Sequence, residues 1–399
     1  MNYKLVPTPV LVTSLAVAAA LLGDAMLYVV MPSSPELWSL TIVQIGILLS
    51  ANRFIRLITN PLSAVCIEKY GIYNPFKIAL IASLVVLVIY ATSSSFTLLL
   101  LARLLWGTCW SILRLVSQWV ASDQSDDNNL GFNHSSNASI IRLGSIGGAL
   151  FGGILSDFIG YRYAIAIFAI FTVASYFCWI RKSTYAGINT QTTSSPRGNR
   201  FFLVLKDVKV LSIGICGLVV GLAFSGLLGS TLGHFLRFNF GTEYDIIYIT
   251  IGVASLTGIL LGFKSSAEVF VGPFAGLLSD KYGRLRTLII SASVFSVGLS
   301  LLGLFDNLLV IYALLFLAFT GGVMLMMQLL SLVGVIAEGD RKSDIFSCYN
   351  TFQDVGSAIG PFMGLSLIQG ENLGTIYLLS GLLVYFLIIC LCFYYRNTR

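Results

Sequence analysis

Residues 276–286 read Gly-Leu-Leu-Ser-Asp-Lys-Tyr-Gly-Arg-Leu-Arg, a short polar stretch between two long apolar segments. A related stretch lies 212 positions earlier, where Glu68-Lys69-Tyr70-Gly71 corresponds to Asp280-Lys281-Tyr282-Gly283. The same offset aligns three further pairs: residues 46–49 with 258–261, Pro61 with Pro273, and the glycine-rich 144–152 with 356–364. Chance similarity between apolar segments would not keep one register over so much of the chain. The sequence therefore predicts two duplicated halves.

The composition shows which solvent surrounds the chain. Of its 399 residues, 56% are hydrophobic and only 11% are charged, and the mean hydropathy is +0.87. A soluble globular protein carries roughly a quarter charged residues. The composition thus excludes a soluble enzyme, a disordered chain and a secreted disulfide scaffold.

Long apolar segments follow one another along the whole chain. A bilayer core of roughly 30 Å needs about 20 apolar residues per helix. Twelve segments meet this requirement: residues 8–31, 41–66, 75–94, 96–120, 137–158, 161–180, 208–233, 246–278, 285–304, 308–336, 345–368 and 374–394. We therefore predict an all-α polytopic membrane protein with two six-helix bundles, at 1–180 and 208–399, joined by a polar cytoplasmic linker at 181–207.

Basic residues are unevenly distributed between the two ends of the predicted helices. Of the 24 Lys and Arg, 16 fall on the side of the termini, six fall inside the spans, and two, Arg162 and Arg237, fall on the opposite side. Cytoplasmic loops carry the excess of Lys and Arg, so both termini are predicted to be cytoplasmic. Topology thus explains most of the net charge of +6, and no nucleic-acid partner is expected.

The stretch at 276–286 resembles the cytoplasmic gating motif of the major facilitator superfamily, and the resemblance extends over essentially the whole chain. It implies that family's twelve-helix fold, in the branch of proton-coupled exporters and drug-proton antiporters. An acid just beyond a helix end accepts from the first amides of a neighbouring helix and pairs with Arg, which holds the cytoplasmic side shut. The gating residues so implied are Glu68, Gly71, Gly276, Asp280, Gly283, Arg284, Arg286 and Asp354.

The first copy of this motif departs from the family pattern. Ala64 stands where Gly is usual, Glu68 replaces Asp, and Asn74-Pro75 replaces the basic end. A simple turn that satisfies the positive-inside rule is the alternative interpretation of both copies.

Two further motifs carry the resemblance. Arg103-Leu104-Leu105-Trp106-Gly107 is similar to the family motif associated with proton coupling, and the glycines of span five have the spacing of the antiporter motif, although Ala149 stands where Pro is expected. Small residues four apart also simply let helices approach closely. The candidates for this packing role are Gly144, Gly148, Gly152, Gly153, Gly356, Gly360, Pro361 and Gly364.

Charged side chains occur inside the predicted spans, where each costs roughly 2.5 to 3.5 kcal/mol on insertion scales. They are Asp24, Arg53, Arg56, Arg103, Arg114, Arg142, Lys264, Glu268 and Asp354. Spans three, six, nine and twelve carry none in their interiors. In the resembled family those four spans face lipid and the others line the cavity, so the charges are distributed as the resemblance requires.

Six basic groups against three acidic ones predict an electropositive cavity and a substrate with an anionic group. Arg103, Trp106, Gly107, Trp110 and Arg114 share one stripe of span four, where two indoles offer aromatic stacking. The candidate substrate-binding residues are Arg53, Arg56, Trp106, Trp110, Arg114, Arg142 and Lys264. A purely structural role, in which Asp24 neutralises Arg103 and Glu268 neutralises Lys264, stays open.

Asp24 is the leading candidate for a proton carrier, with Arg103 and Glu268 as further candidates for proton coupling. A desolvated carboxylate favours its protonated form and a neighbouring Arg opposes this, so such a group can exchange a proton as the cavity alternates between sides. No cofactor or metal is expected, since the chain has two distant histidines and no CxxC pair.

The sequence thus predicts a secondary active transporter of the cytoplasmic (inner) membrane that acts as a monomer. It would move a small anionic or zwitterionic organic solute by alternating access, coupled to protons and in the direction of export. Multidrug efflux of cationic or lipophilic compounds and proton symport of an anionic metabolite are alternatives within the same class. A channel and a non-transporting membrane scaffold are the alternatives outside it.

Overall fold

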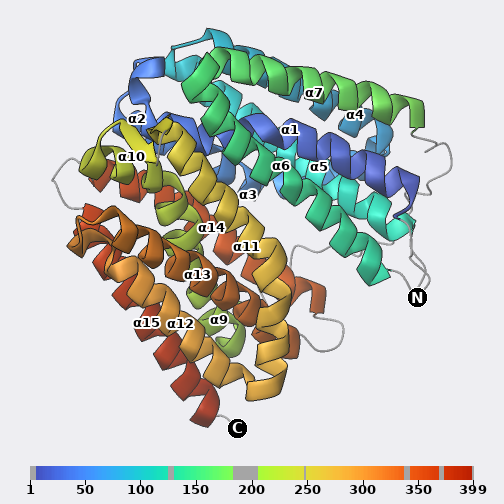
Figure 1. Ribbon diagram of the computed structural model, residues 1–399. Coiled ribbons are helices and arrows are strands. Elements are labelled where there is room, and N and C mark those ends of the chain that lie inside the picture. The colour runs from blue at the N-terminus through green and yellow to red at the C-terminus, as the bar shows by residue number, and fades with distance from the viewer. Residues whose placement is uncertain are drawn as a thin grey trace. The chain divides into compact units, whose positions relative to one another are not determined.

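The computed structural model describes residues 6–124, 130–182, 205–246, 249–336, 342–367 and 373–397 (Figure 1). Nearly all of these residues are helical, which confirms the predicted all-α class. The elements in order are α1 (Thr8–Ser33), η1 (Pro35–Trp38), α2 (Ile42–Phe54), α3 (Arg56–Tyr70), α4 (Tyr73–Thr92), α5 (Phe96–Asp123), α6 (Leu130–Ile159), α7 (Tyr161–Lys182), α9 (Val208–Val220), η2 (Gly221–Leu228), α10 (Gly229–Phe240), β1 (Glu243–Ile246), β2 (Ile249–Gly252), α11 (Val253–Tyr282), α12 (Arg284–Ser300), η3 (Leu302–Leu304), α13 (Leu308–Ile336), α14 (Lys342–Leu367) and α15 (Leu373–Asn397).

Contacts divide the chain into two compact units, each of which is described by itself. Unit 1 contains residues 1–193 and 241–265, and unit 2 contains residues 194–240 and 266–399. The helix α11 therefore contributes its first part to unit 1 and its remainder to unit 2. The bundle boundaries predicted at 180 and 208 stay a prediction.

In unit 1, α1 packs most extensively against α6. The backbones approach closely because α6 presents glycines: a Cβ added at Gly144 would overlap the carbonyl of Ala18, and one at Gly148 would overlap that of Leu22. Gly153 makes the same kind of approach to α11, at Ala254. Small residues thus set the spacing of α6 from α1 and from the start of α11.

Unit 2 repeats this packing between α14 and the chain running from α9 through η2. Gly356 corresponds to Gly144 at an offset of 212 positions, and it approaches the carbonyl of Leu218. Leu218 in turn corresponds to Ala18 at an offset of 200 positions. The first span of the repeat is therefore offset by 200 positions and the later ones by 212. The difference of twelve residues lies between α10 and α11, where α10 runs on to Phe240 and is followed by the antiparallel hairpin β1–β2.

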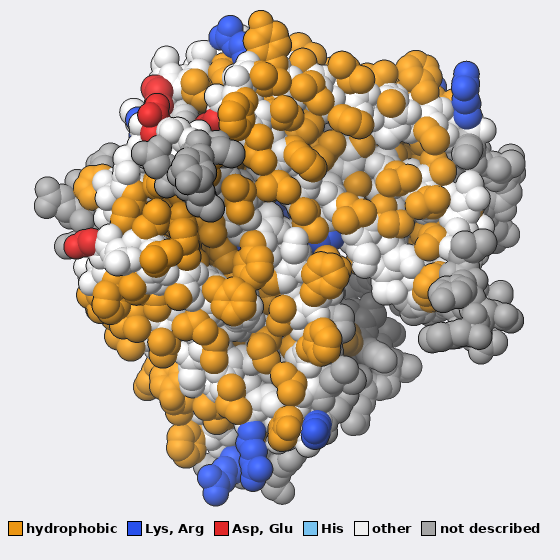
Figure 2. Space-filling model, viewed as in Figure 1, with side chains coloured by type: hydrophobic (Ala, Val, Ile, Leu, Met, Phe, Trp, Pro, Cys, Tyr) orange, Lys and Arg blue, Asp and Glu red, His pale blue; other side chains and the backbone are white. Residues whose placement is uncertain are grey.

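The described helices fit a membrane by length and composition. Eleven of them are long and apolar enough to cross it, with α2 and α3 counted together and α9 to α10 counted as one. The twelfth predicted span corresponds to α14, which carries polar residues such as Asn350, Gln353 and Asp354 and is not among the eleven. Hydrophobic side chains are spread over the described part of the face in Figure 2, as expected for a surface in contact with lipid.

The predicted starts of two spans were wrong, and two other spans contain interruptions that were not predicted. The second span is interrupted at Ile55, so that it forms two helices. The fifth span begins at Leu130 and not at 137, which places Asn133 and Asn137 inside a helix with exposed fractions of 1% and 4%. The eighth begins at Val253, because residues 249–252 pair as a strand. In the seventh, η2 is a π-helical segment between two α-helices.

Candidate functional site

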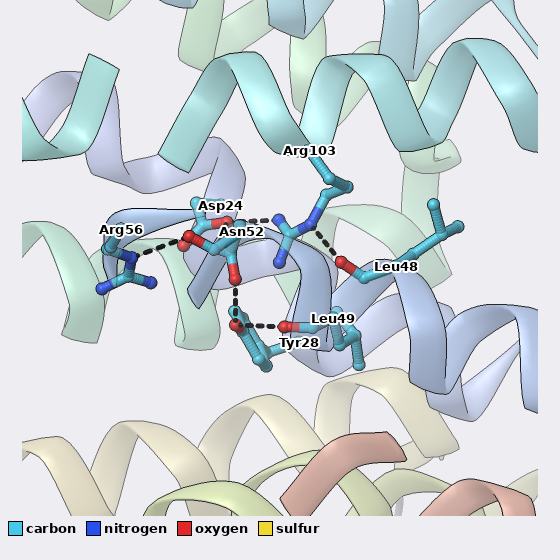
Figure 3. A network of polar contacts seen from close by, with 7 residues as sticks. All are labelled: Asp24, Tyr28, Leu48, Leu49, Asn52, Arg56 and Arg103. Atoms are coloured by element: carbon cyan, nitrogen blue, oxygen red, sulfur yellow. Dashed lines mark hydrogen bonds and ion pairs between the residues drawn. The ribbon is translucent and has the colours of Figure 1, made fainter. Parts of the chain in front are cut away.

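A buried ion pair joins α1 to α5 in unit 1. The guanidinium of Arg103 donates through Nη1 to Asp24 Oδ1. It also donates through Nε to the carbonyl of Leu48, at a distance of 3.0 Å. Arg103 is 0% exposed and Asp24 is 8% exposed. Charges buried to this degree are tolerated only when they are paired and hydrogen-bonded. Figure 3 shows both groups with Asn52 and Tyr28 beside them.

Asn52 and Tyr28 complete the surroundings of this pair. Asn52 Nδ2 donates to Asp24 Oδ1 at 3.4 Å, and the Tyr28 hydroxyl donates to Asn52 Oδ1 at 3.1 Å. The Tyr28 ring also lies under two cations, with its centroid 5.3 Å from Cζ of Arg103 and 5.1 Å from Cζ of Arg53. The ring face attracts both guanidiniums, so Tyr28 holds Arg53 next to the ion pair.

The interruption between α2 and α3 places Arg56 against α5. Its Nε donates to the carbonyl of Asn52 at 2.9 Å, and its Cζ lies 6.0 Å from the centroid of the Trp110 ring. The indoles of Trp106 and Trp110 are neighbours, with centroids 6.2 Å apart. An arginine over an indole surface is an arrangement that binds an anionic group and an aromatic ring together.

A second group of cations lies in unit 1. Lys264, near the end of the part of α11 that belongs to this unit, interacts electrostatically with Arg53 on α2 and Arg142 on α6. All three side chains are half-buried. Three basic side chains that interact with one another in an apolar bundle make this a candidate electropositive region.

The structure does not bring every predicted site residue to this region. Arg114 lies on α5, eleven residues beyond Arg103 and so about 16 Å further along the helix axis. Glu268 and Asp354 are half-buried and belong to unit 2, where Asp354 lies on α14. Their predicted roles therefore stay predictions.

The two copies of the gating motif share one backbone feature. Gly71 has a φ of 74° and Gly283 a φ of 92°, and a Cβ added at either would meet no atom within 4 Å. Glycine is needed there for the conformation of the turn. Glu68 and Arg286 are exposed and Arg284 is half-buried, while the burial of Gly276 and Asp280 lies outside what the structure describes.

The remaining packing candidates lie on α14 in unit 2. Gly360 approaches Gly226 of η2, Gly364 faces Leu227 and Thr231, and Pro361 lies within the helix. In unit 2 the counterpart of Asp24 at the offset of 200 is Phe224, which is fully buried with its ring centroid 5.8 Å from that of Phe295.

Sequence reasoning missed Asn52, Tyr28 and Asp157. A signal existed for Tyr28, which lies one helical turn beyond Asp24, and for Asn52, which the offset of 212 aligns with Lys264. Asp157 near the end of α6 accepts from the backbone N–H of Ser255 at 2.6 Å and so caps the start of α11. Among the described residues, no group of three His, Cys, Asp or Glu is placed to hold a metal ion.

Comparisons with known proteins agree on one family. A family model described as Major Facilitator Superfamily matches residues 13–267 and 254–399. The human Chromaffin granule amine transporter is 23% identical over 372 residues, which are 89% of this chain and 66% of the relative. Multidrug resistance protein MdtG of Klebsiella pneumoniae (strain 342) is 24% identical over 246 residues, which are 61% of this chain and 57% of the relative. The match thus spans 57% to 66% of the length of these relatives.

Two solved structures have the same fold. A mutant of the nucleoside transporter NupG superposes with a TM-score of 0.77 at 13% identity, covering 98% of this chain and 99% of the other. A bacterial homolog of the human lysosomal transporter Spinster, inward-facing and occupied, superposes with a TM-score of 0.74 at 14% identity, covering 97% and 95%. At these identities the likeness shows the fold alone.

Proposed function

The chain belongs to the Major Facilitator Superfamily, and we propose that it is a secondary transporter that exports a small anionic or zwitterionic organic solute in exchange for protons. It works as a monomer in the cytoplasmic membrane, with both termini in the cytoplasm. The orientation is supported by the distribution of Lys and Arg along the chain. Transport by alternating access is supported by the duplicated halves and by the two glycine turns of the gating motif.

The observation that carries this proposal is the buried Asp24–Arg103 pair. An ionisable group inside a membrane-spanning bundle is expensive to place there and is a functional candidate by default. In our proposal Asp24 takes up a proton on one side of the membrane and releases it on the other. Arg103 stabilises the ionised form, so that the carboxylate exchanges its proton only when the cavity opens.

The proposed substrate class is supported by the basic side chains of unit 1. Arg53, Arg142 and Lys264 form the electropositive region of unit 1, and Arg56 lies over Trp110 beside it. A carboxylate or phosphate group would bind the cations, while an aromatic part of the substrate would stack on the indoles. If the substrate is a zwitterion, its cationic group would also pair with the ionised carboxylate of Asp24.

Proton-coupled efflux of cationic or lipophilic compounds is the second candidate. It is favoured by the names of two relatives, an amine transporter and a multidrug resistance protein. In that case a cationic substrate would compete with the proton at Asp24, and the Trp106–Trp110 surface would bind its apolar part. The following tests also distinguish this transporter from a proton symporter that takes up its substrate, from a channel and from a non-transporting scaffold.

Binding and transport in purified protein separate these candidates. A thermal-shift screen of carboxylates, phosphates and cationic dyes identifies the ligand class, and counterflow in liposomes distinguishes a carrier from a channel, because only a carrier accelerates exchange. We expect Arg53→Gln and Lys264→Gln to abolish transport of the anionic ligand while folded protein stays in the membrane. Unchanged transport in both variants, or stabilisation by cationic dyes alone, would contradict the anionic substrate.

A further inference from the structure

Asn52 lies at the centre of the polar network in Figure 3. It is fully buried, and each half of its carboxamide has a different partner: Nδ2 donates to Asp24 Oδ1 at 3.4 Å, and Oδ1 accepts from the Tyr28 hydroxyl at 3.1 Å. The Tyr28 hydroxyl has a second acceptor within reach, the carbonyl of Leu49 at 3.0 Å. A hydroxyl has one proton and donates to one acceptor at a time. The network therefore holds one more acceptor than Tyr28 uses.

We propose that Asn52 and Tyr28 form a two-state hydrogen-bond switch that keeps Asp24 satisfied in both of its protonation states. The inference rests on the proposed role of Asp24 as proton carrier. In the ionised state, Asn52 donates to the Asp24 carboxylate and Tyr28 donates to Asn52, which are the contacts described here. Arg103 pairs with the same carboxylate.

The second state follows when a proton binds to Asp24. A rotation of about 180° around χ2 of Asn52 exchanges Oδ1 and Nδ2, which leaves both distances in place. The protonated carboxyl then donates to Asn52 Oδ1, Asn52 Nδ2 donates to the Tyr28 hydroxyl, and Tyr28 donates to the carbonyl of Leu49. One proton is taken up by the carboxylate and no other proton leaves the network.

The chain around Asn52 resists a displacement of its backbone. The carbonyl of Asn52 is held by Arg56 Nε at 2.9 Å, and Gly107 of α5 packs directly against it. The backbone is therefore fixed while the carboxamide turns. Of the side chains of this size, only a carboxamide offers a donor and an acceptor at equal reach, whereas a carboxylate or an alkyl group cannot serve both states.

The other groups that face Asp24 do not supply such an exchange. Arg103 on α5 is a permanent cation that only donates. Tyr90 on α4 is a buried phenol close to both charges, but among the described residues its hydroxyl makes no hydrogen bond to Asp24. From α6, Gly148 and Gly152 face Leu22 and Met26 at this level of α1. From α7, Thr172 donates to the carbonyl of Ala19 at 3.1 Å. Asn52 is thus a positioning residue that acts on the proton site through Asp24 and Tyr28.

Infrared difference spectra recorded against pH on the purified full chain in lipid nanodiscs test the switch without any substrate. We expect a carboxyl band that titrates and is lost in Asp24→Asn, together with a tyrosine band that titrates at the same pH and is lost in Tyr28→Phe. Asn52→Leu should remove the tyrosine signal.

Asn137→Leu is the matched control. Asn137 is also a buried asparagine between helices, where it accepts from Ser14 at 2.7 Å, away from Asp24. Both signals should persist in this variant with unchanged midpoints. If Asn52→Leu does not fold, the wild-type and Tyr28→Phe spectra still show whether the Tyr28 hydrogen bond changes at the pH where Asp24 titrates.

Two different failures can be told apart. A titrating Asp24 band without a Tyr28 signal, or a Tyr28 signal that survives in Asn52→Leu, would overturn the switch and leave the proposed proton carrier intact. The absence of any carboxyl band that depends on Asp24 would overturn the proton carrier, and the switch with it.

Discussion

Replacing Gly107 with alanine should displace α2 from α5 at the point where the two helices hold Asn52. A Cβ at this position would overlap the carbonyl oxygen of Asn52 and Cγ2 of Ile55. The carbonyl cannot turn away, because it belongs to the backbone and is held by Arg56 Nε. The two helices must therefore separate by roughly 1 Å to restore a normal non-bonded contact.

The consequence is a loss of both stability and activity. Overpacking of this kind costs about 1–3 kcal/mol, which we expect to appear as a lower unfolding temperature in detergent. The Asn52–Asp24 hydrogen bond is already 3.4 Å long and would be broken by such a movement. A misplacement of about 1 Å lowers rates by up to about 100-fold, so transport driven by a pH gradient in liposomes should fall by one to two orders of magnitude.

Gly147→Ala is the control for this variant. A Cβ there meets the terminal Cδ2 of Leu22 at 3.2 Å, and that flexible side chain can move aside. Its unfolding temperature and transport rate should match those of the wild type. If Gly107→Ala behaves in the same way as Gly147→Ala, the close approach of α2 to α5 does not position the site, and the reasoning is refuted.

Two further variants test the ion pair and the start of α11. Arg103→Met should lower the free energy of unfolding by about 3–5 kcal/mol, because it leaves the Asp24 charge buried without its partner, and the double variant Asp24→Leu/Arg103→Met should recover most of this loss. Equal losses in the single and double variants, measured by unfolding in SDS, would rule out a net ionic interaction. Asp157→Ala should cost about 1 kcal/mol, because the N–H of Ser255 loses its acceptor. Asp157→Asn keeps an acceptor and should cost less, so equal unfolding temperatures in the two Asp157 variants would contradict the capping role.

The fold was largely predictable because hydrophobicity determines most of it. Uninterrupted apolar segments of membrane length mark the helices, and the repeat at an offset of 212 marks the duplication. The errors occur where local chemistry overrides that pattern. Residues 246–252 are apolar enough to extend a helix, yet they contain the β-branched Ile249, Thr250 and Ile251, which pair in a hairpin. Polar residues from 130 to 136 suggested a loop, but they continue α6, where Asn133 donates to the carbonyl of Gln124 at 2.9 Å.

The site was predictable in its charges and not in its neutral groups. Asp24 and Arg103 stand out because a charge inside a span is rare. Their contact depends on how α1 and α5 are placed against each other, and the spacing of residues within α5 does not predict that placement. The only signals for Asn52 and Tyr28 are their positions relative to Lys264 and Asp24, and these are weak because amides and phenols occur in spans for many reasons. Arg114 shares its stripe with Arg103 on a helical wheel but is displaced along the axis, which a wheel does not show.

The most direct test of the central claim is the response of Asp24→Asn to a pH gradient. Wild-type protein in liposomes, with the ligand found in the thermal-shift screen, should transport that ligand faster when a pH gradient is imposed. Asp24→Asn should fold, bind the ligand and catalyse exchange without a gradient, but show no acceleration when the gradient is applied. Gradient-driven transport that persists in Asp24→Asn would contradict the claim that this carboxylate carries the proton.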